Sequence, residues 1–97
     1  MDKVLGLRLF ANALDKLDYD ICQINGSVLV VSQFTLLADI QRGRRPSFSA
    51  AAAPDDAERL YNMAVARFAE RVPVQSRRFG ADMQVTLVND GPFTLIL

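Results

Sequence analysis

Apolar residues recur along this chain with two different periods, and the periods separate one helix from several strands. From Pro54 to Val72 they recur at spacings of three and four, which predicts a helix with one buried stripe. Proline suits the first helical turn, acidic residues follow it, and Pro73 ends the helix. The predicted stripe consists of Ala57, Leu60, Tyr61, Ala64, Phe68 and Val72.

Strand-like segments lie on both sides of this helix. The β-branched, almost continuous apolar run Ser27–Ala38 predicts a buried central strand, and the alternation over Ala81–Leu87 predicts a half-buried one. Leu7–Phe10 and Phe93–Leu97 predict two short apolar strands. Asn25-Gly26 is a strong turn signal immediately before the central strand.

The remaining segments complete the expected architecture. Met1–Leu5 resembles the tail of a helix, and Ala11–Asp20 and Asp39–Ala53 are expected to be loops. A chain of 97 residues is one domain at most. The pattern therefore predicts a single α+β domain over residues 1–97, with a mostly antiparallel sheet or partial β-barrel and one long helix packed on it.

Charge and composition narrow the classes of partner. Eleven basic residues balance eleven acidic ones, so the chain has no broad positive field for long stretches of nucleic acid. Any RNA contact has to come from local clusters, of which Arg42, Arg44 and Arg45 form the densest; Arg77-Arg78 is a second. The apolar fraction of 51% is high for so short a chain, which suits either an oligomer or a well-filled core.

The cysteine and histidine counts limit the chemistry. The one cysteine, Cys22, excludes an internal disulfide and is expected to be a small buried residue in a strand. No secretory signal or membrane-length apolar run is present, so we expect a cytoplasmic protein without membrane contact. Without histidine the chain lacks the usual general base and metal ligand, so we expect neither a metal nor another cofactor.

Two segments place polar groups among apolar ones. Ser32-Gln33-Phe34-Thr35 interrupts the predicted central strand, where buried polar side chains need partners. Asn89-Asp90-Gly91-Pro92-Phe93-Thr94 joins the two last predicted strands. On the residues alone, the polar side chains of the first segment either have a function or form hydrogen bonds with neighbouring loops. The second segment is either a rigid backbone ledge that presents carbonyl oxygens to a ligand or an ordinary turn. The basic loop Gly43–Ser49 is either a phosphate contact or a solvated loop.

These two segments resemble the SQxT and NxGPxT motifs of the D-aminoacyl-tRNA deacylase family. Arg45-Pro46-Ser47-Phe48 and Phe79–Met83 are also similar to the family, and the similarity runs over nearly the whole chain. The resemblance implies a hydrolase that releases D-amino acids from the 3′ end of aminoacyl-tRNA. It also implies a homodimer in which the two motifs meet across the subunit interface.

The resemblance further implies a role for each motif residue. Gly91 and Pro92, joined by a cis bond and supported by Asn89, are expected to exclude L-amino acids with their carbonyl oxygens. Glycyl-tRNA would pass this filter, because glycine has no side chain to reject. The first-motif residues are expected to seat the terminal adenosine and the ester carbonyl, partly through backbone N–H groups; they are Ser32, Gln33, Phe34 and Thr35.

Thr94 is the candidate nucleophile, but a threonine without a neighbouring base is weakly activated. We therefore expect Thr94 to position the substrate while the 2′-hydroxyl of the terminal ribose assists hydrolysis. Arg42, Arg44 and Arg45 are expected to contact the tRNA.

The sequence also departs from the family pattern. The resemblance implies preceding strands and most of a helix that this sequence lacks, so we expect an amino-terminally truncated domain. Asp15-Lys16-Leu17-Asp18 replaces the usual GKMN, and Phe93 replaces a common valine. An active deacylase is therefore weighed against a catalytically inactive remnant that serves as a dimerisation module or binds the tRNA 3′ end.

Overall fold

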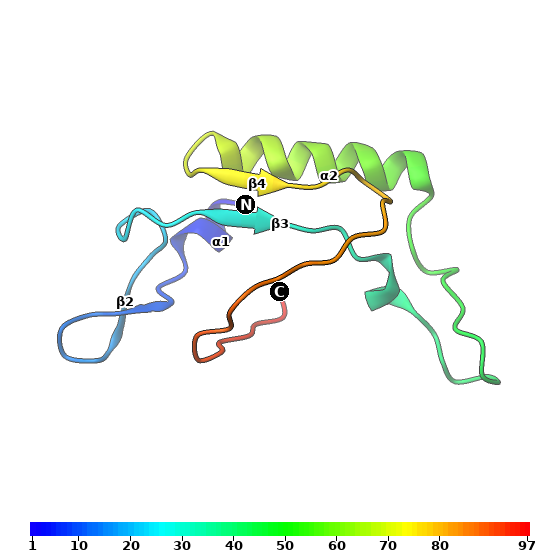
Figure 1. The fold of residues 1–97 in the computed structure, drawn as a ribbon, viewed down its shortest axis with the longest axis horizontal. Coiled ribbons are helices and arrows are strands. Elements are labelled where there is room, and N and C mark those ends of the chain that lie inside the picture. Colours follow the sequence, from blue (N-terminus) through cyan, green and yellow to red (C-terminus); the bar gives the residue numbers. More distant parts are fainter.

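Helix α2 (Pro54–Ala69) is the longest element of the computed structural model, which describes residues 1–97 (Figure 1). Pro54 occupies the first turn and Asp55 and Asp56 follow it, at the end of the helix dipole that favours negative charge. The predicted helix is confirmed, although Val72 lies in the turn beyond it, where its N–H still donates to the carbonyl of Phe68 (3.0 Å).

The other elements are short and form two separate sheets. They are α1 (Asp2–Gly6), β1 (Phe10–Ala11), β2 (Leu17–Tyr19), β3 (Val28–Val30), the 3₁₀ helix η1 (Phe34–Leu37) and β4 (Val74–Ser76). β1 pairs with β2 in antiparallel orientation, whereas β3 pairs with β4 in parallel, and α2 packs on β4. The α+β class with one long helix is confirmed, and the strands joined through that helix form a parallel pair.

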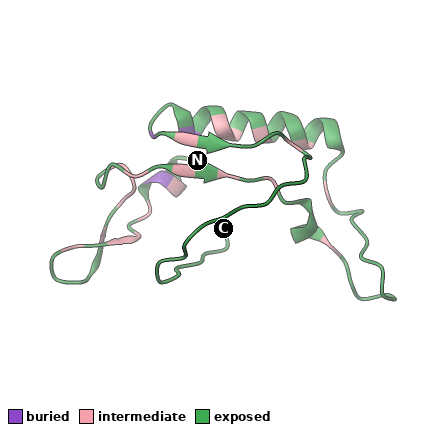
Figure 2. Cartoon of the chain, in the orientation of Figure 1, coloured by how far each residue is buried: buried purple, intermediate pink, exposed green.

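The core lies where α1 meets the end of α2 and the start of β4. Leu5, Phe68 and Val72 are the only buried residues of the chain, with exposed fractions of 1%, 8% and 6% (Figure 2). Val4, Ile21, Cys22, Val28, Val30 and Val74 are partly buried around them. The radius of gyration is 16.1 Å, whereas about 13 Å is usual for a compact domain of 100 residues. The single chain is therefore open and elongated.

This openness corrects the predicted burial of two elements. The central strand expected over Ser27–Ala38 is only β3, with Val28 and Val30 half-buried and Leu29 49% exposed. Leu60 of the predicted helix stripe is 51% exposed. The reason is that β3 has a single strand neighbour, β4, so part of its apolar surface has no cover.

The strands expected over Ala81–Leu87 and Phe93–Leu97 are absent. Both segments are exposed, and residues 82–97 make no backbone–backbone hydrogen bond. Alternation creates a preference for a strand, but a strand forms only when a neighbouring strand satisfies its N–H and C=O groups. No strand of this chain takes that place.

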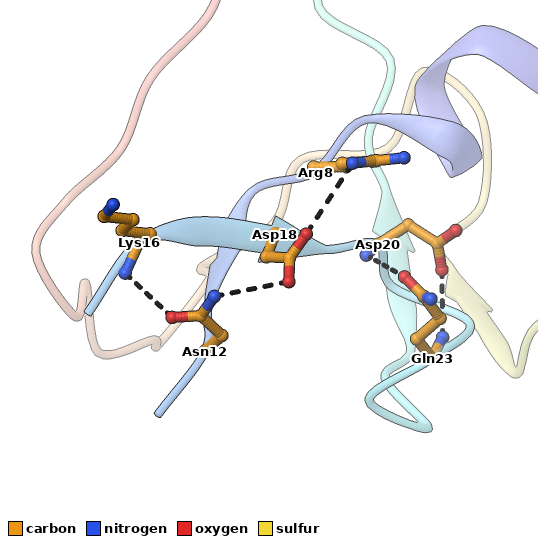
Figure 3. Close-up of polar contacts among 6 residues, drawn as sticks. All are labelled: Arg8, Asn12, Lys16, Asp18, Asp20 and Gln23. Carbon is orange, nitrogen blue, oxygen red and sulfur yellow. Dashed lines mark hydrogen bonds and ion pairs between the residues drawn. The ribbon is translucent and has the colours of Figure 1, made fainter. Parts of the chain in front are cut away.

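The β1–β2 hairpin corrects two further predictions. The strand expected at Leu7–Phe10 begins only at Phe10, and Ala11–Asp20, expected to be a loop, contains β2. Figure 3 shows the polar contacts that hold this hairpin: Asn12 Nδ2 donates to Asp18 (3.3 Å), and Arg8 pairs with the same carboxylate (3.6 Å).

The tip of this hairpin needs a left-handed residue. Asp15 adopts φ +58° there, and Asn12 Oδ1 accepts the N–H of Lys16 across the turn (3.1 Å). Aspartate is among the few residues other than glycine that tolerate this conformation, so it can occupy the tip of the turn.

The predicted turn at Asn25-Gly26 is confirmed, but Cys22 lies in this turn and not in a buried strand. The Gly26 N–H donates to the Ile21 carbonyl (2.9 Å), while Asp20 and Gln23 exchange reciprocal hydrogen bonds of 2.9 Å (Figure 3). A Cβ at Gly26 would lie 2.6 Å from Ile21 Cγ1, so this close approach requires glycine.

Candidate functional site

The first motif lies where β3 ends and η1 begins. Ser32 is half-buried, whereas Gln33, Phe34 and Thr35 are exposed. Gln33 Nε2 donates to Thr35 Oγ1, so the two polar side chains of the motif bind each other. The 3₁₀ helix η1 leads the backbone away from the direction of β3. The Gln33 and Thr35 side chains therefore stay in solvent and lose no hydration free energy through burial.

Phe34 connects this motif to the basic loop. Its ring meets that of Phe48 edge to face, with ring centroids 4.9 Å apart and planes at 72°. Phe34 remains 59% exposed and Phe48 37% exposed, so both rings stay accessible from solvent. Aromatic rings that are held in place and still exposed can stack on a nucleobase.

The basic loop is closed by a bridge between Asp39 and Ser47. The N–H of Asp39 donates to the Ser47 carbonyl (2.7 Å), and the N–H of Ser47 donates back to the Asp39 carbonyl (2.9 Å). The bridge encloses Arg42, Arg44 and Arg45, which are exposed and take part in neither of the two ion pairs of the structure. The three guanidinium groups are therefore available to bind anions.

The second motif forms a bend in the carboxyl-terminal segment. Gly91–Pro92 is a cis peptide bond, and Gly91 has φ +119°, a conformation that residues with a Cβ rarely adopt. Asn89, Phe93 and Thr94 are exposed, and no hydrogen bond of the structure includes the side chain of Asn89 or Thr94.

The chain does not bring its two motifs together. In Figure 1 the carboxyl-terminal bend lies on the opposite side of the view from η1, and no hydrogen bond joins them. A groove of about 620 Å³ lies between the β3–β4 pair and Gln84–Thr86. It reaches Val31, the neighbour of Ser32, and Arg77 of the second basic cluster lines it, but no residue of the two motifs or of the arginine loop does.

The structure adds a residue that the sequence indicated only as part of the helix core. The hydroxyl of Tyr61 in α2 lies 3.1 Å from the Val30 carbonyl and 3.0 Å from the Arg77 carbonyl, and it accepts the N–H of Arg77 at 3.2 Å. Helical spacing predicted that Tyr61 faces the sheet, but spacing carries no information on what its hydroxyl meets.

A protein-family profile described as D-Tyr-tRNA(Tyr) deacylase matches residues 1–97. The chain belongs to this family. Members of the deacylase family are hydrolases, so the expected enzyme class is confirmed.

Relatives of known name agree with this assignment. The chain is 53% identical over 97 residues to a D-aminoacyl-tRNA deacylase of Pasteurella multocida, covering 100% of the chain and 67% of that relative. It is 57% identical over 97 residues to the D-aminoacyl-tRNA deacylase of Klebsiella pneumoniae strain 342, covering 99% of the chain and 67% of the relative. The chain thus spans about two thirds of these deacylases.

A solved structure shares the fold of this deacylase family member. The c-Myc DNA Unwinding Element Binding Protein superposes with a TM-score of 0.81 at 32% sequence identity. The match covers 95% of the chain and 64% of the other protein, so the chain spans less than two thirds of that structure. No helix of the chain has the length and hydropathy required to cross a membrane.

Proposed function

We propose that this protein hydrolyses the ester bond of D-aminoacyl-tRNA and releases a free D-amino acid and tRNA. The observation that carries the proposal is that SQFT and NDGPFT both occur, intact and in order, in a chain that matches the deacylase family throughout. A member that had lost its activity would be free to lose these motifs as well.

The proposed selectivity rests on the bend at Gly91 and Pro92, with Asn89 supporting it. Carbonyl oxygens of a fixed bend repel the side chain of an L-amino acid, whereas a D-residue directs its side chain elsewhere. Because this filter acts on side chains, glycyl-tRNA is proposed as a second substrate. Glycine at position 91 supports the role of the bend as a filter, since φ +119° excludes most other residues.

The proposed chemistry uses the backbone and the substrate itself. N–H groups of Ser32, Gln33 and Phe34 would stabilise the oxyanion that develops on the ester carbonyl, with Thr35 holding the Gln33 side chain. No histidine is present to activate Thr94, which would therefore orient the ester. The neighbouring 2′-hydroxyl of the terminal ribose assists the attack in this proposal.

The proposed functional unit is a homodimer. Within one chain the two motifs lie apart, so a complete site requires the bend of one subunit beside η1 of the other. Extensive exposed apolar surface supports association, since three of 97 residues are buried while Leu36 is 84% exposed and Ile96 99% exposed.

We propose that Arg42, Arg44 and Arg45 bind phosphates near the tRNA 3′ end. Their loop is attached to the first motif through Phe48 and Phe34, so a bound acceptor strand would lead toward that motif. Guanidinium forks bind phosphate oxygens in a bidentate manner. Such a substrate, together with the free thiol of Cys22, suits the cytoplasm.

A second candidate is a module that dimerises or binds the tRNA 3′ end without hydrolysis. The separation of the two motifs in one chain favours it. The experiment combines the purified protein with D-tyrosyl-tRNA and measures both binding and release of tyrosine. Binding with release supports the deacylase, whereas binding without release supports the module.

A further inference from the structure

The hydroxyl of Tyr61 joins three parts of the chain that are far apart in sequence. Val30 is the last residue of β3, and Arg77 directly follows β4, whereas Tyr61 lies in the middle of α2. A phenol offers one hydrogen and two lone pairs. It accepts the Arg77 N–H at 3.2 Å and shares its hydrogen between the carbonyls of Val30 (3.1 Å) and Arg77 (3.0 Å).

The Tyr61 ring is held as well as its hydroxyl. It lies against the ring of Phe79, with centroids 5.8 Å apart and planes at 43°. The tyrosine is half-buried between α2 and the end of the parallel pair. Its position is therefore fixed from two sides, and the hydroxyl holds the ends of both strands to the helix.

The hydrogen bond from the Tyr61 hydroxyl to the Val30 carbonyl, the Tyr61 tether, lies two residues before the first motif. The β3–β4 register ends at Val30 and Ser76, and no backbone–backbone hydrogen bond includes Val31 or Ser32. The next backbone bond runs from Leu36 N–H to the Gln33 carbonyl, at a long 3.4 Å. The Tyr61 hydroxyl is thus the last fixed point before the backbone whose N–H groups the proposed chemistry uses.

We infer that Tyr61 is a positioning residue for the first motif, holding the backbone of Val31–Gln33 in the orientation that ester hydrolysis requires. This inference rests on the proposed deacylase function. Tyr61 acts through Val30 and touches no substrate. Because a positioned donor stabilises the transition state more than the bound substrate, its loss lowers kcat and leaves KM nearly unchanged.

The test uses Tyr61→Phe, which keeps the ring against Phe79 and removes only the hydroxyl. The other tyrosine of the chain provides the matched control, because the Tyr19 hydroxyl makes no hydrogen bond. Val72→Ala is the second control, since it removes core volume (Val72 is 6% exposed) without touching the tether. Backbone amide chemical shifts and amide hydrogen exchange are measured by NMR in all three variants and the parent, together with kcat and KM per folded molecule.

For Tyr61→Phe we expect kcat to fall about tenfold at nearly constant KM. We also expect the amide NMR signals of Val31–Gln33 to shift, and exchange at Arg77, whose N–H donates to the Tyr61 hydroxyl, to accelerate, while the α2 amides change little. Tyr19→Phe matches the parent, and Val72→Ala accelerates exchange broadly with no loss of kcat per folded molecule.

Unchanged amide signals of Val31–Gln33 in Tyr61→Phe would overturn the inference, as would a kcat loss that Val72→Ala reproduces. If the parent protein hydrolyses no D-aminoacyl-tRNA, the proposed function fails. In that case the amide signals of Val31–Gln33, together with exchange at Arg77, decide whether Tyr61 holds this backbone.

Discussion

The ring of Phe34 rests edge to face on the ring of Phe48, with centroids 4.9 Å apart, and so joins the first motif to the basic loop. Apart from this pair of rings, the loop is closed only by the bridge between Asp39 and Ser47. The pair therefore determines where the three arginines stand relative to η1.

A double-mutant cycle measures the coupling between these two rings. Phe34→Ala and Phe48→Ala should each lower the free energy of unfolding, and the double variant should lose less than the sum by about 0.5–1.5 kcal/mol. We place the value at the lower end, because both rings are partly exposed. Urea unfolding measures the free energy of unfolding of each variant. The cycle of Phe34→Ala with Phe93→Ala is the control, since Phe93 has no ring partner and its effects should add; additivity in both cycles would show that the ring pair has no energetic weight.

Gly91 should be intolerant of a side chain. At φ +119° a Cβ costs about 1–3 kcal/mol, and it would lie 3.4 Å from the N of Phe93. Gly91→Ala should therefore shift the bend and reduce the ratio of D- to L-tyrosyl-tRNA hydrolysis, or abolish activity. Gly6→Ala, whose Cβ meets nothing within 4 Å, is the matched control. A Gly91→Ala protein with parental rate and chiral ratio would refute the assigned filter.

The arginine loop should bind tRNA mainly through charge. Replacing Arg42, Arg44 or Arg45 by glutamine should weaken tRNA binding and make the plot of log affinity against log salt less steep by about 0.7–0.9 for each phosphate that the loop no longer binds. Arg71→Gln is the control, because Arg71 lies in the turn beyond α2, at the helix end far from this loop. Equal slopes in the loop variants and the control would exclude phosphate binding by this loop.

Two changes, one in the protein and one in the substrate, distinguish Thr94 from the 2′-hydroxyl of the terminal ribose as the group that drives hydrolysis. Thr94→Val should retain hydrolysis to within about tenfold, since a threonine without a base contributes little as a nucleophile. D-Tyrosyl-tRNA that ends in 2′-deoxyadenosine should be hydrolysed at least about a hundredfold more slowly by the parent protein, because a positioned proton-transfer group contributes that much. The reverse pattern, with Thr94→Val inactive and the deoxy substrate normal, would identify Thr94 as the nucleophile.

The parts of the fold that sequence predicted are those with local causes. Helix α2 follows from a 3.6-residue period, Pro54 at its start and acidic residues after it, all within one segment. The turn at Asn25-Gly26 follows equally from the residues that form it. The α+β class could be predicted because it depends only on the presence of such helical and strand-forming segments.

The parts that sequence missed depend on distant neighbours. The Phe93–Leu97 segment has the composition of a strand but no strand beside it, so its pattern alone could not decide its structure. Helical spacing directed Tyr61 toward the sheet, yet its hydrogen bond with Val30 spans 31 positions of sequence. The functional motifs are identified through resemblance to a family. Physical reasoning alone favours an ordinary turn at Gly91 and, by a small margin, polar partners in neighbouring loops for Ser32.

The most direct test of the deacylase proposal is the rate of tyrosine release from D-tyrosyl-tRNA and from L-tyrosyl-tRNA under single-turnover conditions, with each tRNA incubated alone as the background. We expect release from the D-substrate to exceed that from the L-substrate by at least about a hundredfold. Equal rates for the two substrates, or no release above background from either, would contradict the account.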